Sequence, residues 1–373
     1  MHYNVRGLLI SAFVLAGATG GALTAQTASG TDQNNTQYGT SSAEFLLLGA
    51  GARGVSLGGT IAAVATSDAS ALYYNPGAAS MMGRPGLLIG TYDYVGGTHY
   101  SWGGLNFPFG GGSNSIGIQI GSFGFSDQPV YTVDQPDGTG TTYSVTETFV
   151  GATFARNFSD RFSTGLTLKG IADQLGAAKG TAFAVDFGTH YHAKLKGHPI
   201  NMAFVLSNLG SNLTYSGDGL AVNVIRDTTP GAPLEDPQPG QLDTKGFQVP
   251  TNFQIALSYD VVYSKTMALT ALGGFNQPRS NGAGFSFGVE WNLPHLGNTK
   301  FGLRAGGSYT SAPANNISTT LPTQATGAES AQGWAGGGGL GYFNDKFRLA
   351  FDYAYRSLGI LGGTNYFSVT LGW

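Results

Sequence analysis

The stretch FRLAFDYAY, residues 347–355, alternates large apolar residues with charged or small ones. Successive side chains of a β-strand point to opposite faces of a sheet, so this segment has one apolar face and one face that carries Arg348 and Asp352. The same period of two recurs at 253–261, at 285–293 and at the end of the chain, 367–373. The repeated pattern predicts an all-β chain whose strands each have one apolar face.

From residue 86 onward the alternation predicts fourteen strands. Most are about ten residues long, the length that a tilted strand needs to cross a bilayer. The expected strands lie near 86–95, 98–107, 113–125, 142–155, 161–172, 180–195, 198–206, 251–261, 266–275, 283–293, 299–309, 333–343, 345–355 and 363–373.

The connections between these strands differ in length. The three longest, 126–141, 207–250 and 310–332, all fall at the same end of an up-and-down sheet, whereas turns such as 196–197 at the other end are tight. Outer-membrane barrels have short periplasmic turns and long outer loops. The arrangement predicts a transmembrane antiparallel barrel with exposed outer loops.

The charged residues of the strands lie opposite the aromatic and aliphatic ones. An arginine on the lipid face at mid-bilayer costs about 2–4 kcal/mol, so we expect the charged face to line the lumen. The expected lumen charges are Asp186, Glu290, Arg304, Arg348 and Asp352. The expected aromatic belts are Tyr92, Tyr94, Trp102, Trp291, Tyr309, Tyr355 and Trp373.

The composition disfavours or excludes several other classes of protein and site. Only 10% of the 373 residues are charged, against about a quarter in soluble proteins, which disfavours a secreted β-sandwich with a water-facing polar surface. The chain has no cysteine, which excludes disulfides, thiolate metal sites and a cysteine nucleophile. Its net charge of −3 gives no basic footprint for nucleic acid.

The N-terminus has the pattern of a secretory signal. Arg6 precedes a short apolar run at 8–15, and small residues follow up to Ala25, after which we expect cleavage. An uncleaved anchor is the alternative, but the run is shorter than the roughly 20 residues of a spanning helix. Residues 26–41 are predicted to be a flexible N-terminal segment.

Residues 42–85 lack the two-residue period and are predicted to form a small plug, or hatch, in the lumen. A helical turn is expected at 43–48, and a second helix through 71–73 that Ser67 or Asp68 could cap. Asn75-Pro76-Gly77 is a turn signal in which glycine permits positive φ. Glu44, Arg53 and Asp68 are candidates for pairing with lumen charges.

The same segment resembles a known family. The residues that carry the likeness are AEFL at 43–46, GAGARG at 49–54, Gly58-Gly59, DASA at 68–71 and YNPG at 74–77. They are similar to the N-terminal signature of the PorV/PorQ family, which is itself similar to FadL-type fatty-acid channels with fourteen strands and a hatch bearing an Asn-Pro-Ala motif. Gly77 stands where that motif has alanine. The likeness covers about a tenth of the chain.

The resemblance implies a bacterial outer-membrane protein surrounded by lipid, with one of two functions. FadL relatives pass hydrophobic small molecules, and PorV is an accessory of type IX secretion that receives protein cargo. The preferred hypothesis is passive transport by a protein that is not an enzyme and needs no cofactor. A non-transporting scaffold whose outer loops bind a partner stays open as an alternative.

Other motifs carry less weight. Gly49, Gly51 and Gly54 spell a dinucleotide fingerprint, but Gly58-Gly59 interrupts the helix that it requires. Ser56 and Ser286 lie in Gly-x-Ser-x-Gly matches, which leave a barrel hydrolase as a remote alternative. His190 and His192 share a strand face with Asp186 and Lys194; we interpret them as a solvated lumen or rim patch rather than a metal site.

The last strand is a predicted assembly signal. It ends on Trp373, preceded at alternate positions by Phe367, Val369 and Leu371. Outer-membrane barrels similar to this one end in an aromatic residue that the barrel assembly machinery reads, so that machinery is an expected partner.

Overall fold

The computed structural model describes residues 40–65, 68–224, 236–280, 282–294, 296–310 and 333–373. The predicted signal peptide, nearly all of the segment 26–41 and the connection 311–332 lie outside the described residues. Within those residues, every helix is too short or too polar to cross a membrane.

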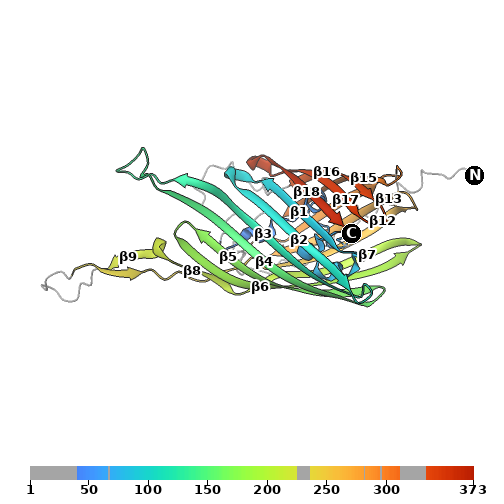
Figure 1. Cartoon of the computed structure of the whole chain (residues 1–373), viewed down its shortest axis with the longest axis horizontal. Helices are drawn as coiled ribbons and strands as arrows, with labels where there is room; N and C mark the ends of the chain where they lie inside the picture. The colour runs from blue at the N-terminus through green and yellow to red at the C-terminus, as the bar shows by residue number, and fades with distance from the viewer. Residues whose placement is uncertain (1–39, 66–67, 225–235, 281, 295, 311–332) are drawn as a thin grey trace, which may run out of the picture. The chain divides into compact units, whose positions relative to one another are not determined.

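A closed antiparallel barrel of fourteen strands forms the body of the chain (Figure 1). Each strand pairs with its neighbour along the chain, and β1 pairs with β18 from Gly86↔Gly372 to Tyr92↔Tyr366, which leaves no free edge. The strands are β1 (Gly86–Asp93), β2 (His99–Phe109), β3 (Asn114–Pro129), β4 (Thr142–Ser159), β5 (Phe162–Leu175), β6 (Ala178–Leu195), β7 (His198–Gly210), β12 (Asn252–Tyr263), β13 (Ala268–Pro278), β14 (Gly284–Asn292), β15 (Thr299–Thr310), β16 (Gly333–Phe343), β17 (Arg348–Ser357) and β18 (Gly363–Gly372).

Short helices precede and connect the strands. Those before the barrel are η2 (Glu44–Leu47), α2 (Ala52–Ser56), α3 (Ala71–Tyr74) and η3 (Pro76–Met81). Single 3-10 turns in the connections are η4 (Val95–Gly97), η5 (Asp218–Leu220) and η7 (Gly359–Leu361).

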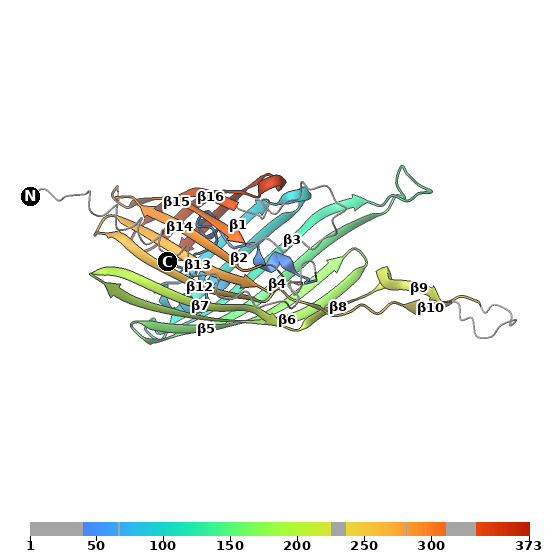
Figure 2. The same ribbon diagram turned by 180° about the vertical axis from the view of Figure 1, so that it is seen from behind.

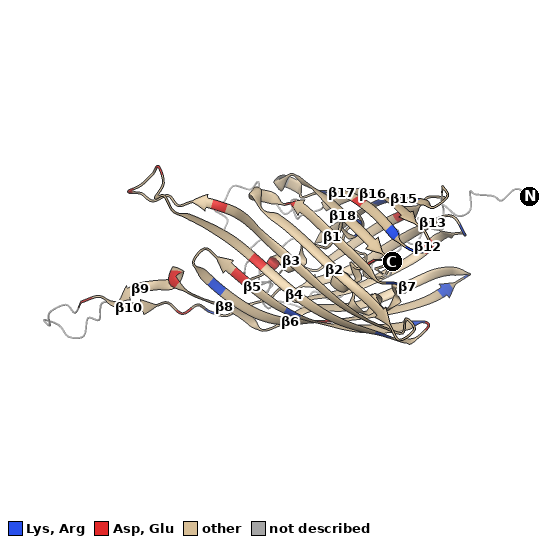
Figure 3. Cartoon of the chain, in the orientation of Figure 1, with Lys and Arg blue, Asp and Glu red and all other residues tan. Residues whose placement is uncertain are grey.

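The strand faces follow the predicted alternation. On β5 the outward Leu166 and Leu168 are exposed, whereas Ser163, Thr167 and Lys169, on the opposite face of the strand, are buried inside the barrel. Charged residues are sparse along all the strands, as Figure 3 shows. The barrel therefore presents an apolar outer wall and a more polar inner one, as membrane barrels do.

The prediction of aromatic belts is wrong for Tyr92 and Trp102. Tyr92 and Trp102 are only 5% and 2% exposed and face inward, together with Tyr100 and Tyr366. The rings of Tyr92 and Tyr366 are in contact, with centroids 3.9 Å apart and an angle of 39° between their planes. The inner wall of β1, β2 and β18 is aromatic because it packs against the N-terminal segment. The belt prediction rested on the places of Tyr92 and Trp102 near strand ends, which does not distinguish the two faces. Trp291, Tyr309 and Trp373 are exposed as predicted.

The connection 207–250 was predicted to be a plain exposed loop and is more ordered. Strand β8 (Asn212–Ser216) pairs with β6, and β11 (Phe247–Gln248) pairs with β8. Strands β9 (Ala221–Val224) and β10 (Gln238–Gln241) form a separate hairpin, which lies at the same end as the β3–β4 tip (Figure 2). Leu213 and Val249 are buried in the core, which explains why this segment folds back onto the sheet.

Candidate functional site

Residues 42–85 pack against the inner wall of the barrel. The largest hydrophobic cluster joins residues of this segment, such as Phe45, Leu57 and Leu72, to inward residues of the strands, such as Trp102 and Phe149. We refer to residues 42–85 as the hatch segment; strand β1 begins directly after it at Gly86.

The hatch backbone approaches the strands closely where paired strands carry glycine. Gly165 and Gly188 face each other on β5 and β6, and the Asn75-Pro76-Gly77 turn lies against both. A Cβ on Gly188 would meet the Asn75 side chain, and one on Gly165 would meet the Pro76 carbonyl. A second pair, Gly288 and Gly306 on β14 and β15, receives Leu57 in the same way.

The Asn75 side chain fixes the turn that rests on this first glycine pair. Its Oδ1 accepts from the Gly77 N–H at 3.0 Å, and its Nδ2 donates to the carbonyls of Ala62 and Thr189 at 3.0 and 3.1 Å. One amide thus closes the turn and ties it to β6. Gly77 does not adopt positive φ, contrary to the prediction; glycine is needed because a Cβ there would lie 2.6 Å from the Gly188 carbonyl oxygen.

The predicted helix cap also differs. Helix α3 begins after Ser70 and has no side-chain cap. Asp68 Oδ1 instead accepts from the Ser70 N–H at 2.9 Å, before the first residue of the helix, and Asp68 Oδ2 contacts Arg53 at 3.3 Å. Ser67 lies outside the described residues.

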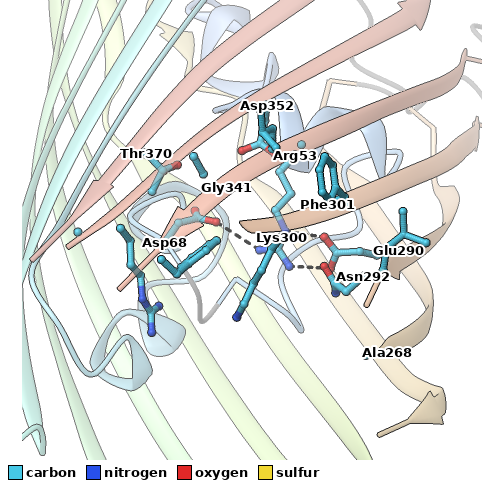
Figure 4. A pocket seen from close by; sticks show the side chains of 18 of the residues that line it. Arg53, Asp68, Ala268, Glu290, Asn292, Lys300, Phe301, Gly341, Asp352 and Thr370 are labelled. Atoms are coloured by element: carbon cyan, nitrogen blue, oxygen red, sulfur yellow. Dashed lines mark hydrogen bonds and ion pairs between the residues drawn. The ribbon is translucent and has the colours of Figure 1, made fainter. Parts of the chain in front are cut away.

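Arg53 joins the hatch segment to the barrel wall through buried ion pairs. Its Nε and Nη2 donate to the two oxygens of Glu290, both at 2.8 Å, in the bidentate geometry that gives the strongest arginine–carboxylate contacts. Glu290 on β14 also accepts from Arg304 on β15 at 2.7 Å, and Arg304 contacts Asp352 on β17 at 2.5 Å. Figure 4 shows Arg53 between Glu290 and Asp68.

This five-residue network, which we call the latch, contains two guanidiniums and three carboxylates. Burial disfavours the charged form of Arg53, but the attraction of Glu290 and Asp68 outweighs it and raises the pKa of Arg53. Arg53 therefore stays charged. Arg53 was predicted to pair with a lumen charge, and its partner is Glu290; Asp68, predicted likewise, pairs with Arg53 of the same segment. The register Glu290↔Arg304 brings the two lumen residues together.

A second buried network fixes the opposite wall. The Lys169 ammonium contacts the Asp186 carboxylate at 2.7 Å and donates to Asn208 Oδ1 at 2.8 Å. The Asn208 N–H in turn donates to Asp186 at 2.8 Å. Asp186 was a predicted lumen charge, but Lys169 was missed, although its parity on β5 would have placed it on the inner face.

The remaining predicted residues lie apart from the latch. Arg348 begins β17 at the short-turn end, with its guanidinium carbon 5.6 Å from the Phe343 ring centre. Glu44 lies on η2 with an exposed side chain and belongs to none of the ion pairs of the described residues. The terminal Phe367, Leu371 and Trp373 are exposed on the outer face of the barrel, and Val369 between them is half-buried.

The interpretation of the histidines as a solvated patch is wrong for His190. That ring is 1% exposed, and its Nε2 lies 3.0 Å from the Ala63 carbonyl oxygen, because the hatch segment covers this part of β6. His192 contacts Asn201 Oδ1 at 2.7 Å. Among the described residues, no group of three or more histidine and acidic side chains could hold a metal.

Two cavities lie on either side of residues 52–59. One, of about 370 Å³, is open toward the short turns and is lined by Arg53, Met82, Met267 and Lys300; we call it the inner cavity. The other, of about 260 Å³, reaches the long-loop ends of the strands at Asn208 and Thr310 and touches the hatch segment at Val55 and Gly59. The hatch segment separates the two.

The chain resembles several solved structures, whereas comparison with family models and with curated protein sequences gives no match. A Pseudomonas aeruginosa FadL homologue aligns over 87% of this chain and 99% of its own, with a TM-score of 0.51 and 12% identity. The chain has the fold of the FadL-type channels. The Ralstonia pickettii toluene transporter TbuX aligns over 88% of this chain and 98% of its own, with a TM-score of 0.52 and 13% identity. The monoaromatic hydrocarbon channel CymD aligns over 87% of this chain and 97% of its own, with a TM-score of 0.52 and 13% identity.

Proposed function

We propose that this protein is a passive outer-membrane channel for hydrophobic small molecules, of the PorV/PorQ kind, and not an enzyme. The observation that carries the proposal is the pair of cavities interrupted by a latched hatch segment. Both cavities lie inside a barrel with an apolar outer wall, and the neighbours with this FadL-type fold include transporters of toluene. Such a conduit requires no cofactor, because the substrate moves down its gradient.

A side route is part of the proposal. A groove of about 550 Å³ runs over the lipid-facing side of β16, β17, β18 and β1. Gly339, Leu340 and Asp352 line both this groove and the inner cavity. Gly338 and Gly339 contribute no side chains, so the wall is thin here. Because β16 pairs with β15 and β17 without a break through these residues, passage of an apolar molecule between the lumen and the membrane would require these strands to separate locally.

A disulfide lock tests whether the hatch segment must move. An ideal Cβ on Gly274 of β13 lies 3.3 Å from the Thr60 Cβ, close to the 3.5–4.5 Å typical of disulfides, and the native chain has no cysteine to interfere. Cells expressing Thr60→Cys/Gly274→Cys are expected to take up radiolabelled toluene only after reduction. Thr60→Cys alone is the matched control and should transport under both conditions. Native uptake by the oxidised double variant would refute transport past a moving hatch.

The outer end of the barrel favours one second candidate, docking of secreted protein cargo as in type IX secretion. Apolar side chains are exposed there on the β3–β4 tip at Tyr131 and Val133, and on the β8–β11 extension at Val224 and Leu242. Purification from the native membrane decides between the two: a stoichiometric exported protein or large translocon, lost when residues 217–243 are deleted, would replace transport as the proposal.

A further inference from the structure

Four exposed cations gather at the short-turn end of β4, β5, β6 and β7. They are Arg156 near the end of β4, Arg161 in the β4–β5 turn, Lys194 near the end of β6 and Lys196 in the β6–β7 turn. The β4–β5 turn lies beside β6, because the His192 N–H donates to the Arg161 carbonyl oxygen at 2.8 Å. We call the four cations the basic rim; Figure 3 shows lysine and arginine in blue at this end of the strands.

The positive charge of the basic rim is not neutralised. The segments 154–164 and 189–200 contain these four cations and one acid, Asp160. Among the described residues, none of the ion pairs within 4.0 Å includes Asp160 or any of the four cations. At the opposite end of the barrel, the β3–β4 connection 126–141 carries three aspartates and no lysine or arginine. The two ends of this side of the barrel therefore differ in the sign of their charge.

Exposed apolar side chains accompany the cations on the outward faces of the same strands. They are Phe158, Phe162, Tyr191 and Leu195, which are between 38% and 64% exposed. The Phe158 and Phe162 ring centres lie 6.3 Å apart, and the guanidinium carbon of Arg156 lies 5.7 Å from the Phe158 ring centre. Aromatic rings beside arginine and lysine are typical of the membrane–water boundary, where the rings meet the acyl chains and the long cationic side chains reach the headgroups.

The β6–β7 turn places a lysine where the backbone favours another residue. Leu195 pairs with His198, so Lys196 and Gly197 form a two-residue turn, with φ angles of 52° and 86°. Turns of this kind favour Asn-Gly, because positive φ at both positions disfavours most side chains. The needs of the turn do not explain the lysine, whereas a negatively charged surface in front of the turn does.

We propose that the basic rim binds the headgroups of anionic phospholipids in the leaflet at the short-turn end of the barrel. The paired N–H donors of arginine match phosphate oxygens, and lysine adds a mobile point charge. A phospholipid satisfies both features of the surface, since its acyl chains cover the outward rings and its phosphate meets the cations. A soluble acidic protein would meet the cations alone. The inference requires only that the barrel spans a bilayer and does not depend on what passes through it.

Native mass spectrometry of the full-length protein, released from vesicles with equal amounts of phosphatidylglycerol and phosphatidylcholine, tests the proposal. One cation close to an anionic surface changes a binding constant about fivefold. We expect the native protein to retain phosphatidylglycerol at least about tenfold over phosphatidylcholine at low salt, and high salt to reduce this preference. Arg161→Gln/Lys196→Gln, which changes two exposed turn residues, should lower the preference at least about fivefold.

The matched control is Lys179→Gln/Lys245→Gln, which removes two exposed cations at the long-loop end and should keep the native preference. All three proteins should show the same heat-dependent gel mobility, which reports the folded barrel. The proposal is overturned if the native protein shows no preference, or if the two double variants lose the preference equally, because net charge alone would then decide. Capture of an acidic soluble protein that Arg161→Gln/Lys196→Gln abolishes, with the lipid preference unchanged, would replace the lipid by a protein partner. Toluene uptake should persist in both variants, so failure of this proposal leaves the proposed transport standing.

Discussion

Replacing Arg53 by methionine removes the residue that links the hatch segment to the wall. The native latch has a net charge of −1; the variant leaves Asp68, Glu290 and Asp352 with Arg304 as their one remaining guanidinium in the latch. Removing one partner of a buried ion pair costs about 3–5 kcal/mol, because the other charge stays buried. A free-energy difference of about 1.4 kcal/mol changes an equilibrium constant tenfold. The fraction of molecules with a released hatch segment should therefore rise about a hundredfold to a few thousandfold.

A single buried cysteine measures that fraction. Ser56 is fully buried on α2, and the native chain contains no cysteine. The single thiol of Ser56→Cys therefore reacts with a maleimide only when α2 leaves its site. The reaction rate then follows the open population. Adding Arg53→Met should accelerate labelling by the factor above, whereas Lys194→Met should not change it.

A double variant separates the effect of net charge from the effect of packing. Arg53→Met/Glu290→Leu removes one cation and one anion and restores the net charge of −1, so its labelling should be slower than that of Arg53→Met alone. Labelling of Arg53→Met at the native rate would show that packing alone holds the hatch segment. Equal rates for the single and double variants would refute the electrostatic explanation.

Three further predictions concern assembly and the hatch. Gly165→Ala places a methyl against the Pro76 carbonyl and should cost about 1–3 kcal/mol, seen as a lower temperature of gel-mobility shift, whereas Gly170→Ala, with open space around its Cβ, should behave as native. Burial raises the pKa of Tyr73 well above 10, so stability is fully present below about pH 10 and falls as the pH rises further; tyrosinate absorbance should show an alkaline transition that Tyr73→Phe weakens. Deleting 367–373 removes most of the β18 pairing with both neighbours and should abolish assembly, so normal outer-membrane amounts of the truncated chain would contradict the closed barrel.

The barrel could be predicted from sequence because its signal is local. Alternation at 347–355 needs only the strand period and the cost of a charge in lipid, and the observed strand β17, Arg348–Ser357, follows it closely. Tyr92 and Trp102 were predicted to be belt residues because they lie near strand ends, but both occupy the inward parity of their strands. They pack there against the hatch segment, a tertiary contact that the position of a ring along its strand does not encode.

The latch could be predicted only in outline, as pairing of hatch residues with lumen charges, and not by its individual contacts. Arg53 and Glu290 are 237 positions apart, and no periodic pattern encodes their meeting. Lys169 had the right parity but was overlooked beside the more conspicuous carboxylates. The role of Gly77 was also misassigned, because a positive φ and a close backbone approach select the same residue for different reasons.

The hatch segment meets the glycines at 165, 288 and 306 with its main chain and Gly188 with the Asn75 side chain and Pro76. Because the contacts at three of these four positions involve peptide groups common to every residue, the fit tolerates wide chemical drift in the surrounding inner wall but not the addition of a single methyl at any of the four. Mutational scanning of the whole chain should therefore find its least replaceable inner-wall positions where the native side chain is nothing but a hydrogen atom.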